Sequence, residues 1–195
     1  MNYWFLYNLS DGSLYGSPYL GQADIWTNVP PDTAVLGPID SAIASPSVQD
    51  AFYNPHYYTV QDGVLTPLSN IVDLQLTDAK TNKINQIQQS YNDVLTAGFS
   101  SSATGTLYHY AYEQLNQLKL MKLALDIASG NVLFPVPIPA SDGTVIMHDQ
   151  TQYTLFAKDV SSFEWTLQNK LHGIICPGGS ISAATTVDQV NSISW

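Results

Sequence analysis

The chain has 195 residues, of which 45% are apolar and only 11% are charged, so it can bury a core and is not a disordered polymer. Its net charge is −10, with six lysines and no arginine, which excludes the basic surfaces typical of proteins that bind nucleic acid or anionic membrane. No apolar run approaches the ~18 residues of a membrane span, and the first ten residues lack the features of a signal peptide. We expect a soluble protein made in a cytoplasm.

Residues 1–70 have the pattern of a small β-rich domain. Asp11-Gly12 and Asp62-Gly63 each stand between short runs rich in aromatic and β-branched residues, which is a hairpin signal. The segment between them, residues 27–47, contains four of the prolines, and proline lacks the N–H that a strand interior donates. We therefore expect edge strands and loops there rather than a helix.

Half of the 22 aromatic residues lie within the first 58 residues. Trp4, Trp26, Tyr57 and Tyr58 are the candidate interface residues of this domain, because rigid amphipathic rings are favoured where proteins bind sugars or other proteins. The alternative is that these rings fill the core of the β-rich domain or its contact with a neighbouring subunit. The same region, residues 1–79, holds eight aspartates and no lysine, so any docking surface here is acidic.

Residues 71–82 are expected to form a linker, after which the pattern becomes helical. A first helix is predicted to begin at a cap formed by Thr77 or Asp78 and to end at Gly98. A second helix is predicted from Tyr112 to Ser129 and is closed by Gly130. Its expected buried face consists of Leu115, Leu118, Met121 and Leu125, which recur at helical spacing.

The remainder combines a short strand region with further helices. Three alternating prolines at positions 135–139 exclude a helix, and Asp142-Gly143 predicts a turn. Asp149 and Gln152 form a capping-box pattern before an apolar stripe that Gly173 ends. A second, shorter box at Thr186 and Gln189 precedes the end of the chain. The predicted class is α+β, with a mainly helical domain of residues 83–195 that also contains short strands.

Catalytic and metal-binding patterns are weak throughout. The four histidines are not spaced as metal ligands, and His148-Asp149 fits a helix cap better than a catalytic pair. Cys176 is the only cysteine, so no internal disulfide can form, and a buried inert thiol is the expected state. There is no phosphate-binding loop or nucleophile elbow. We expect no enzyme activity, no cofactor and no metal.

Several weak motifs occur together in a characteristic order from Lys83 to the end, which is 113 of the 195 residues. They are "INQIQQSYNDVLTAGFSSSATGTLYHY", the Gln-rich "EQLNQLKLMKLAL", "ASDGTVIMHDQTQYTLF" and the ending "TVDQVNSISW". In this order they resemble a domain-of-unknown-function family from the tail gene clusters of tailed bacteriophages. The N-terminal "YTVQDGVLTPL" is similar to the first module of many small proteins of the tail-fibre region.

The resemblance implies a structural component of the virion tail, in the fibre or baseplate region, that assembles in the host cytoplasm and docks other tail proteins. It also implies a homo-oligomer, such as a trimer, without catalytic residues. Two alternatives stay open: a tail-fibre assembly chaperone that is absent from the mature virion, and a module that binds glycans on the host surface. The terminal Trp195 is expected to anchor the last short helix by packing its indole against the preceding helices, a burial worth roughly 2–3 kcal/mol.

Overall fold

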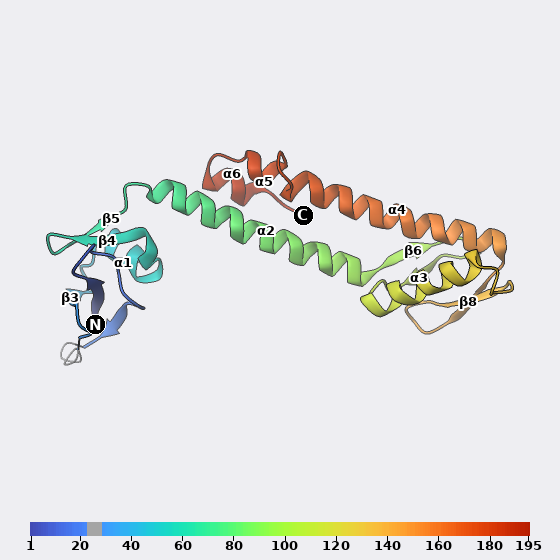
Figure 1. Ribbon diagram of the computed structural model, residues 1–195, viewed down its shortest axis with the longest axis horizontal. Coiled ribbons are helices and arrows are strands. Elements are labelled where there is room, and N and C mark those ends of the chain that lie inside the picture. Colours follow the sequence, from blue (N-terminus) through green and yellow to red (C-terminus); the bar gives the residue numbers. More distant parts are fainter. Residues whose placement is uncertain (23–28) are drawn as a thin grey trace. The chain divides into compact units, whose positions relative to one another are not determined.

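The computed structural model describes residues 1–22 and 29–195 (Figure 1), and the chain forms two compact units, Met1–Asp78 and Ala79–Trp195. The predicted α+β class is confirmed. A three-stranded antiparallel sheet comes first, and long helices interspersed with short hairpins follow it.

The described residues of the first unit form a sheet of order β2-β1-β3, a hairpin, a short helix, a 3-10 turn and the start of a long helix. Their bounds are β1 Asn2–Asn8, β2 Tyr19–Gly21, β3 Thr33–Asp40, α1 Pro46–Tyr53, η1 Pro55–Tyr57, β4 Tyr58–Gln61, β5 Val64–Pro67 and α2 Ile71–Ala97. β1 pairs antiparallel with both neighbours. Pro38 fits the expected edge position, because it lies in β3, at the edge of the sheet.

Both predicted turns of the first unit are confirmed. Asp62 and Gly63 have φ values of 52° and 74°, the left-handed pair that a two-residue hairpin loop between β4 and β5 needs. Gly12 has a φ of 72°, and a Cβ on it would collide with the carbonyl oxygen of Val60. The turn at Asp11-Gly12 therefore packs directly against β4, and only glycine fits there.

Helix α1 was not expected, although its start carries a local signal. The Ser45 side chain accepts a hydrogen bond from the N–H of Val48, and Pro46 occupies the first helical turn. Both are preferred at these positions. Ala51 is fully buried against Tyr3 and Phe5 of β1, so this helix covers one face of the sheet and completes the core of the first unit.

Helix α2 begins earlier than the sequence pattern predicts. It runs from Ile71 to Ala97, so the expected linker, residues 71–82, is helical throughout, and the boundary between the two units falls within it. The predicted cap at Thr77 or Asp78 is therefore wrong. The Thr77 hydroxyl donates to the carbonyl of Asp73 one turn earlier in the helix. The predicted end at Gly98 is correct, because Gly98 has a φ of 90° and donates its N–H to Val94 and Leu95.

The second unit consists of the rest of α2, two hairpins, two further long helices and two short ones. Their bounds are β6 Phe99–Ser101, β7 Tyr108–Tyr110, α3 Gln114–Ala128, β8 Val136–Pro139, β9 Val145–His148, α4 Gln150–Ile175, α5 Ser180–Ala183 and α6 Val187–Ser192. β6 pairs with β7 and β8 pairs with β9, each antiparallel. The segment around the alternating prolines thus forms a strand, and Asp142-Gly143 makes the turn after it.

Two apolar clusters hold the second unit together. The first surrounds Phe99 and Phe156 and joins both hairpins, α3 and α4. The second joins Ile87 of α2, Ile174 of α4 and Ile181 of α5. Helix α4 contributes to both clusters, so it is the element on which the unit is built. Its start is the predicted capping box, with both reciprocal hydrogen bonds between Asp149 and Gln152 present. The predicted end at Gly173 is wrong, because the helix continues to Ile175 and its C-cap is Cys176.

Replacement of Gly98 by alanine is expected to destabilise the second unit far more than the same change at Gly105. Both glycines have a φ near 90°, but a Cβ on Gly98 would collide with the carbonyl oxygen of Tyr110, whereas nothing lies within 4 Å of one on Gly105. The left-handed backbone costs about 1 kcal/mol in either variant, and the clash adds to it only at Gly98. Urea unfolding of the two variants measures the difference, and equal midpoints would contradict it.

Candidate functional site

The aromatic residues predicted as an interface lie inside the first unit. Trp4, Tyr57 and Tyr58 are each at most 8% exposed, so they fill the core, which is the alternative that the sequence left open. The two tyrosines belong to the cluster that the unpredicted helix α1 completes, and the Trp4 ring lies against Gly37 of β3. These rings therefore present no face to a sugar or a partner protein. Trp26, the fourth candidate, lies outside the described residues.

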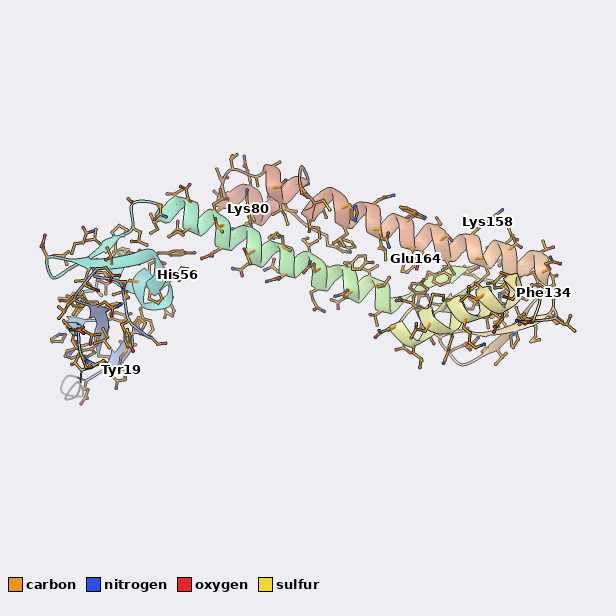
Figure 2. The ribbon with its side chains drawn as sticks, in the orientation of Figure 1. Tyr19, His56, Lys80, Phe134, Lys158 and Glu164 are labelled. Atoms are coloured by element: carbon orange, nitrogen blue, oxygen red, sulfur yellow. The ribbon has the colours of Figure 1, made fainter. Side chains whose placement is uncertain are left out.

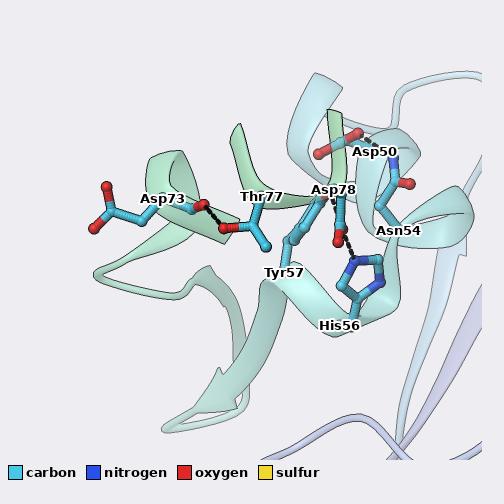
Figure 3. A network of polar contacts seen from close by, with 7 residues as sticks. All are labelled: Asp50, Asn54, His56, Tyr57, Asp73, Thr77 and Asp78. Carbon is cyan, nitrogen blue, oxygen red and sulfur yellow. Dashed lines mark hydrogen bonds and ion pairs between the residues drawn. The ribbon is translucent and has the colours of Figure 1, made fainter. Parts of the chain in front are cut away.

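The hydroxyl groups of the two buried tyrosines reach carboxylates, and Figure 3 shows the first of these contacts. The Tyr57 hydroxyl donates to Asp78 Oδ2 over 2.6 Å, and His56 Nε2 lies 2.8 Å from the same oxygen. Asp78, expected to cap α2, is thus an acceptor within α2 that joins this helix to η1. Both hydrogen bonds lower the pKa of Asp78, the one from Tyr57 more than the one from His56.

A second contact of the same kind lies at helix α1. The Tyr58 hydroxyl donates to Asp50 Oδ2 over 2.7 Å, and Asn54 Nδ2 donates to Asp50 Oδ1 over 2.9 Å. Burial, together with the hydrogen bond to the neighbouring carboxylate, raises the pKa of both Tyr57 and Tyr58 to about 12. Both phenols are therefore protonated donors at neutral pH, which suits structural ties rather than proton transfer.

Two histidines of the second unit also make structural contacts. His148 is fully buried, with Nδ1 3.1 Å from the carbonyl oxygen of Ile146, and burial lowers its pKa. Its neighbour Asp149 caps α4 rather than pairing with the ring. Ser100 and His109 face each other across the β6–β7 hairpin, 3.3 Å apart, and the other ring nitrogen of His109 lies 2.7 Å from the carbonyl oxygen of Ala97. That contact secures the hairpin to the end of α2.

The terminal indole packs against the second unit, as the sequence suggested. Trp195 is half-buried beside the cluster of Ile87, Ile174 and Ile181. Its ring makes an edge contact with Tyr91, at 5.9 Å between centroids, and the Lys170 ammonium lies 4.6 Å from its centroid. The Lys83 ammonium donates to the carbonyl groups of Asn191 and Ile193. Lysine and aromatic contacts together hold the last residues in place.

Helix α3 turns the face predicted as buried outward. Leu115, Leu118, Met121 and Leu125 are between 50% and 62% exposed, and we call them the α3 stripe. The helix instead packs on the Phe99 cluster through Leu120 and Leu123. Because α3 is apolar on two sides, its sequence pattern does not show which side faces the core, and the prediction selected the wrong one.

A groove of about 540 Å³ lies beside the α3 stripe, between α3 and α4, which is within the size range of binding pockets. Its walls are mainly apolar and include Leu118 and Met121 of the stripe together with Val160 of α4. Glu164 of α4, labelled in Figure 2, borders the groove and accepts a hydrogen bond from the Tyr112 hydroxyl. Burial and this carboxylate raise the pKa of Tyr112. The α3 stripe and the groove together are the candidate functional site.

This site is suited to binding another apolar surface. Covering the exposed half of each stripe residue is worth roughly 1 kcal/mol, so the four give about 4 kcal/mol. Association itself costs about 4–15 kcal/mol in lost freedom. A partner that touched only the α3 stripe would therefore bind weakly, and a stable contact needs the groove or a second stripe as well.

The part of the chain that the structure describes, residues 1–22 and 29–195, contains no cluster of three or more histidine, cysteine or acidic side chains able to hold a metal ion. Among the same residues, no helix is both long and apolar enough to cross a membrane. Cys176 has a free thiol at the end of α4 and is half-buried rather than fully buried as expected.

Replacement of Tyr57 by phenylalanine is expected to destabilise the first unit by about 1 kcal/mol, because it removes a hydrogen bond to a carboxylate and keeps the ring. Tyr53→Phe is the matched control, since Tyr53 is 76% exposed and we expect no measurable effect. Chemical denaturation followed by circular dichroism measures both variants. If the two unfold at the same midpoint, the tie to Asp78 contributes nothing to stability.

The second unit is expected to lose stability as the pH falls below 6.5, the ordinary pKa of histidine. The unfolded chain binds a proton at His148 below that pH, but the folded chain does so only at lower pH, so protonation favours unfolding. The neutral His148 ring therefore makes its full contribution to the free energy of unfolding above pH 6.5, and this contribution is lost as the pH falls below that value. Unfolding midpoints measured between about pH 5 and 7 should vary less in His148→Phe than in the unchanged chain, and parallel curves would contradict this.

No protein-family model matches the chain, and neither a curated protein nor a solved structure is significantly similar to it. No function can therefore be transferred from a relative. The function proposed below depends on the chain's own residues and on the sequence motifs described above.

Proposed function

We propose that the protein is a structural component of a bacteriophage tail, in the fibre or baseplate region, and that its second unit assembles with other chains through the α3 stripe and the adjacent groove. The observation that carries this proposal is the exposure of four large apolar side chains along one face of α3. Contiguous apolar surface of this kind marks interaction sites on soluble proteins.

The composition supports an assembly role. The chain has less than half the usual share of charged residues, so much of its surface is uncharged and can be covered by neighbouring subunits at little desolvation cost. Each subunit of an assembly buries part of its surface, and a surface with few charged residues is suited to such burial.

The resemblance to phage tail proteins supports the location. The motifs that carry it extend from Lys83 to Trp195, which includes α3, α4 and the terminal segment. In the structure these motifs correspond to the elements around the two apolar clusters of the second unit. The stripe and the groove are thus part of the region on which the resemblance depends.

The acidic first unit is proposed to contribute a second docking surface. All eight of the acidic residues in positions 1–78 are aspartates, and no lysine or arginine accompanies them. Because the candidate aromatic residues that the structure describes are buried, the contact would be electrostatic rather than aromatic. A partner with a basic surface is the matching chemistry.

Mass spectrometry of purified tailed-phage particles that encode this chain is expected to detect it at a fixed copy number. Particles grown with the Leu118→Gln/Met121→Gln double variant should contain much less of it, because polar side chains remove the apolar contact. Leu155→Gln is the matched control, since Leu155 is an exposed leucine of α4 that does not line the groove.

Other outcomes would favour the alternatives. A chain that is abundant in infected cells but absent from purified particles would contradict the structural role and indicate an assembly chaperone. Glycan-array binding that is lost in Trp26→Ala would indicate a receptor-binding module. Normal incorporation of the double variant would show that the α3 stripe is not the docking surface.

A further inference from the structure

We infer that the partner at the α3 stripe is a second copy of this chain, with the α3 helix of each copy seated antiparallel in the α3–α4 groove of the other. This inference rests on the proposed function, because it names the occupant of the same surface. It describes a twofold contact in which each copy supplies both an apolar ridge and an apolar groove.

The shapes of the two surfaces fit this arrangement. Leu118, Met121 and Leu125 follow one another at spacings of three and four residues, which is the spacing of a helix seam that packs against another helix. The groove beside them has helices for both walls. A third helix in such a groove packs by the ordinary insertion of ridges into grooves, and α3 is a helix whose exposed face is apolar. Leu118 and Met121 belong to the α3 stripe and also line the groove. A helix that binds in the groove therefore covers part of the stripe as well.

The amount of apolar surface also favours two copies. One stripe alone yields about 4 kcal/mol, which only reaches the lower limit of the roughly 4–15 kcal/mol that association costs. In a twofold contact both α3 stripes and both grooves are covered, one of each on either copy. A dimer therefore buries apolar side chains on both chains, whereas a polar partner would bury them on one chain only. The gain from apolar burial is about twice as large in the dimer.

Charge selects the antiparallel direction. Glu164 borders the groove near the start of α3, where the hydroxyl of Tyr112 donates to it. Lys122 lies in the second half of α3, is 75% exposed at its side chain and pairs with Asp126 on its own helix. When two α3 helices lie antiparallel, the second half of one lies beside the first half of the other. Lys122 of each copy is then on the side of the pair where the other copy's Glu164 borders the groove.

The overall charge of the second unit permits close approach. Residues 79–195 contain six lysines and eight acidic residues, a net charge of −2. The repulsion between two copies of this unit is therefore small, and at physiological salt it is further screened beyond about 8 Å. The strongly acidic first units would repel each other, which favours a contact made by the second units.

Sedimentation of the full chain over a range of concentrations tests the inference. The unchanged chain is expected to form dimers, and the Leu118→Gln/Met121→Gln double variant should dissociate at a concentration about tenfold higher or more. Leu155→Gln should dimerise like the unchanged chain, because Leu155 lies outside the groove. Circular dichroism checks that each variant retains its helices.

A charge exchange between chains tests the geometry. Lys122→Glu alone and Glu164→Lys alone should each weaken the dimer, since each places like charges opposite one another. An equimolar mixture of the two variants should regain dimers. One of the two symmetry-related contacts then pairs the introduced glutamate of one chain with the introduced lysine of the other, and the second contact keeps its original pair. Recovery in the mixture cannot arise from either variant folding better by itself.

The inference and the proposed function can fail separately. A chain that stays monomeric up to about 1 mM would overturn the second copy as occupant, and if the α3 double variant were still lost from virions, a different tail protein would occupy the site. Dimers that are insensitive to the α3 substitutions, or a mixture of charge variants that stays monomeric, would also overturn it. Dimers together with normal virion incorporation of the double variant would overturn the proposed function and leave the self-association standing.

Discussion

The packing of aromatic rings around Phe99 is the interaction on which the second unit depends. Its ring centroid lies between 5.5 and 5.9 Å from those of Tyr110, Tyr112, Phe156 and Phe163, so one side chain joins β6, β7, the segment before α3 and two turns of α4. Gly98 immediately before it allows the chain to leave α2 against the backbone of Tyr110. Because this cluster takes the Leu120 side of α3, the opposite side of that helix is left for solvent or for another protein.

The two units share one kind of polar tie and differ in charge. The first unit buries tyrosines whose hydroxyl groups donate to Asp50 and Asp78. Each of these side chains therefore packs its ring in the core and also makes a hydrogen bond to a carboxylate. The second unit has the same kind of tie from the Tyr112 hydroxyl to Glu164, and it buries His148, whose pKa burial lowers. The charge follows this division, with the aspartates of the first unit unbalanced by any lysine. A docking role for the second unit is consistent with its small net charge and its exposed α3 stripe.

Sequence reasoning succeeded where a signal is local. The turns at Asp11-Gly12, Asp62-Gly63 and Asp142-Gly143, the end of α2 at Gly98 and the capping box at Asp149 each depend on a few adjacent residues whose conformational preferences are strong. Helix α1 has such a signal in Ser45-Pro46, but the prolines before it favour strands and loops, so the sequence pattern does not predict the helix. The start of α2 was misplaced because Asp78, a good cap by type, is held within the helix by contacts with His56 and Tyr57.

The sequence by itself determined the α+β class, the turns, the end of α2 and the acidic character of the first unit, since these follow from local propensity and from charge, which do not depend on distant residues. Only the tertiary structure decided which aromatic rings are buried and which side of α3 is exposed. Tyr57 and Tyr58 share a cluster with Tyr3 and Phe5 of the first strand, and Trp4 lies against Gly37 of a later one, while α3 has two apolar sides of similar quality. Whether a side chain is buried depends on the residues that pack against it in the folded chain. The periodicity of the sequence cannot identify those residues when a helix has more than one apolar face.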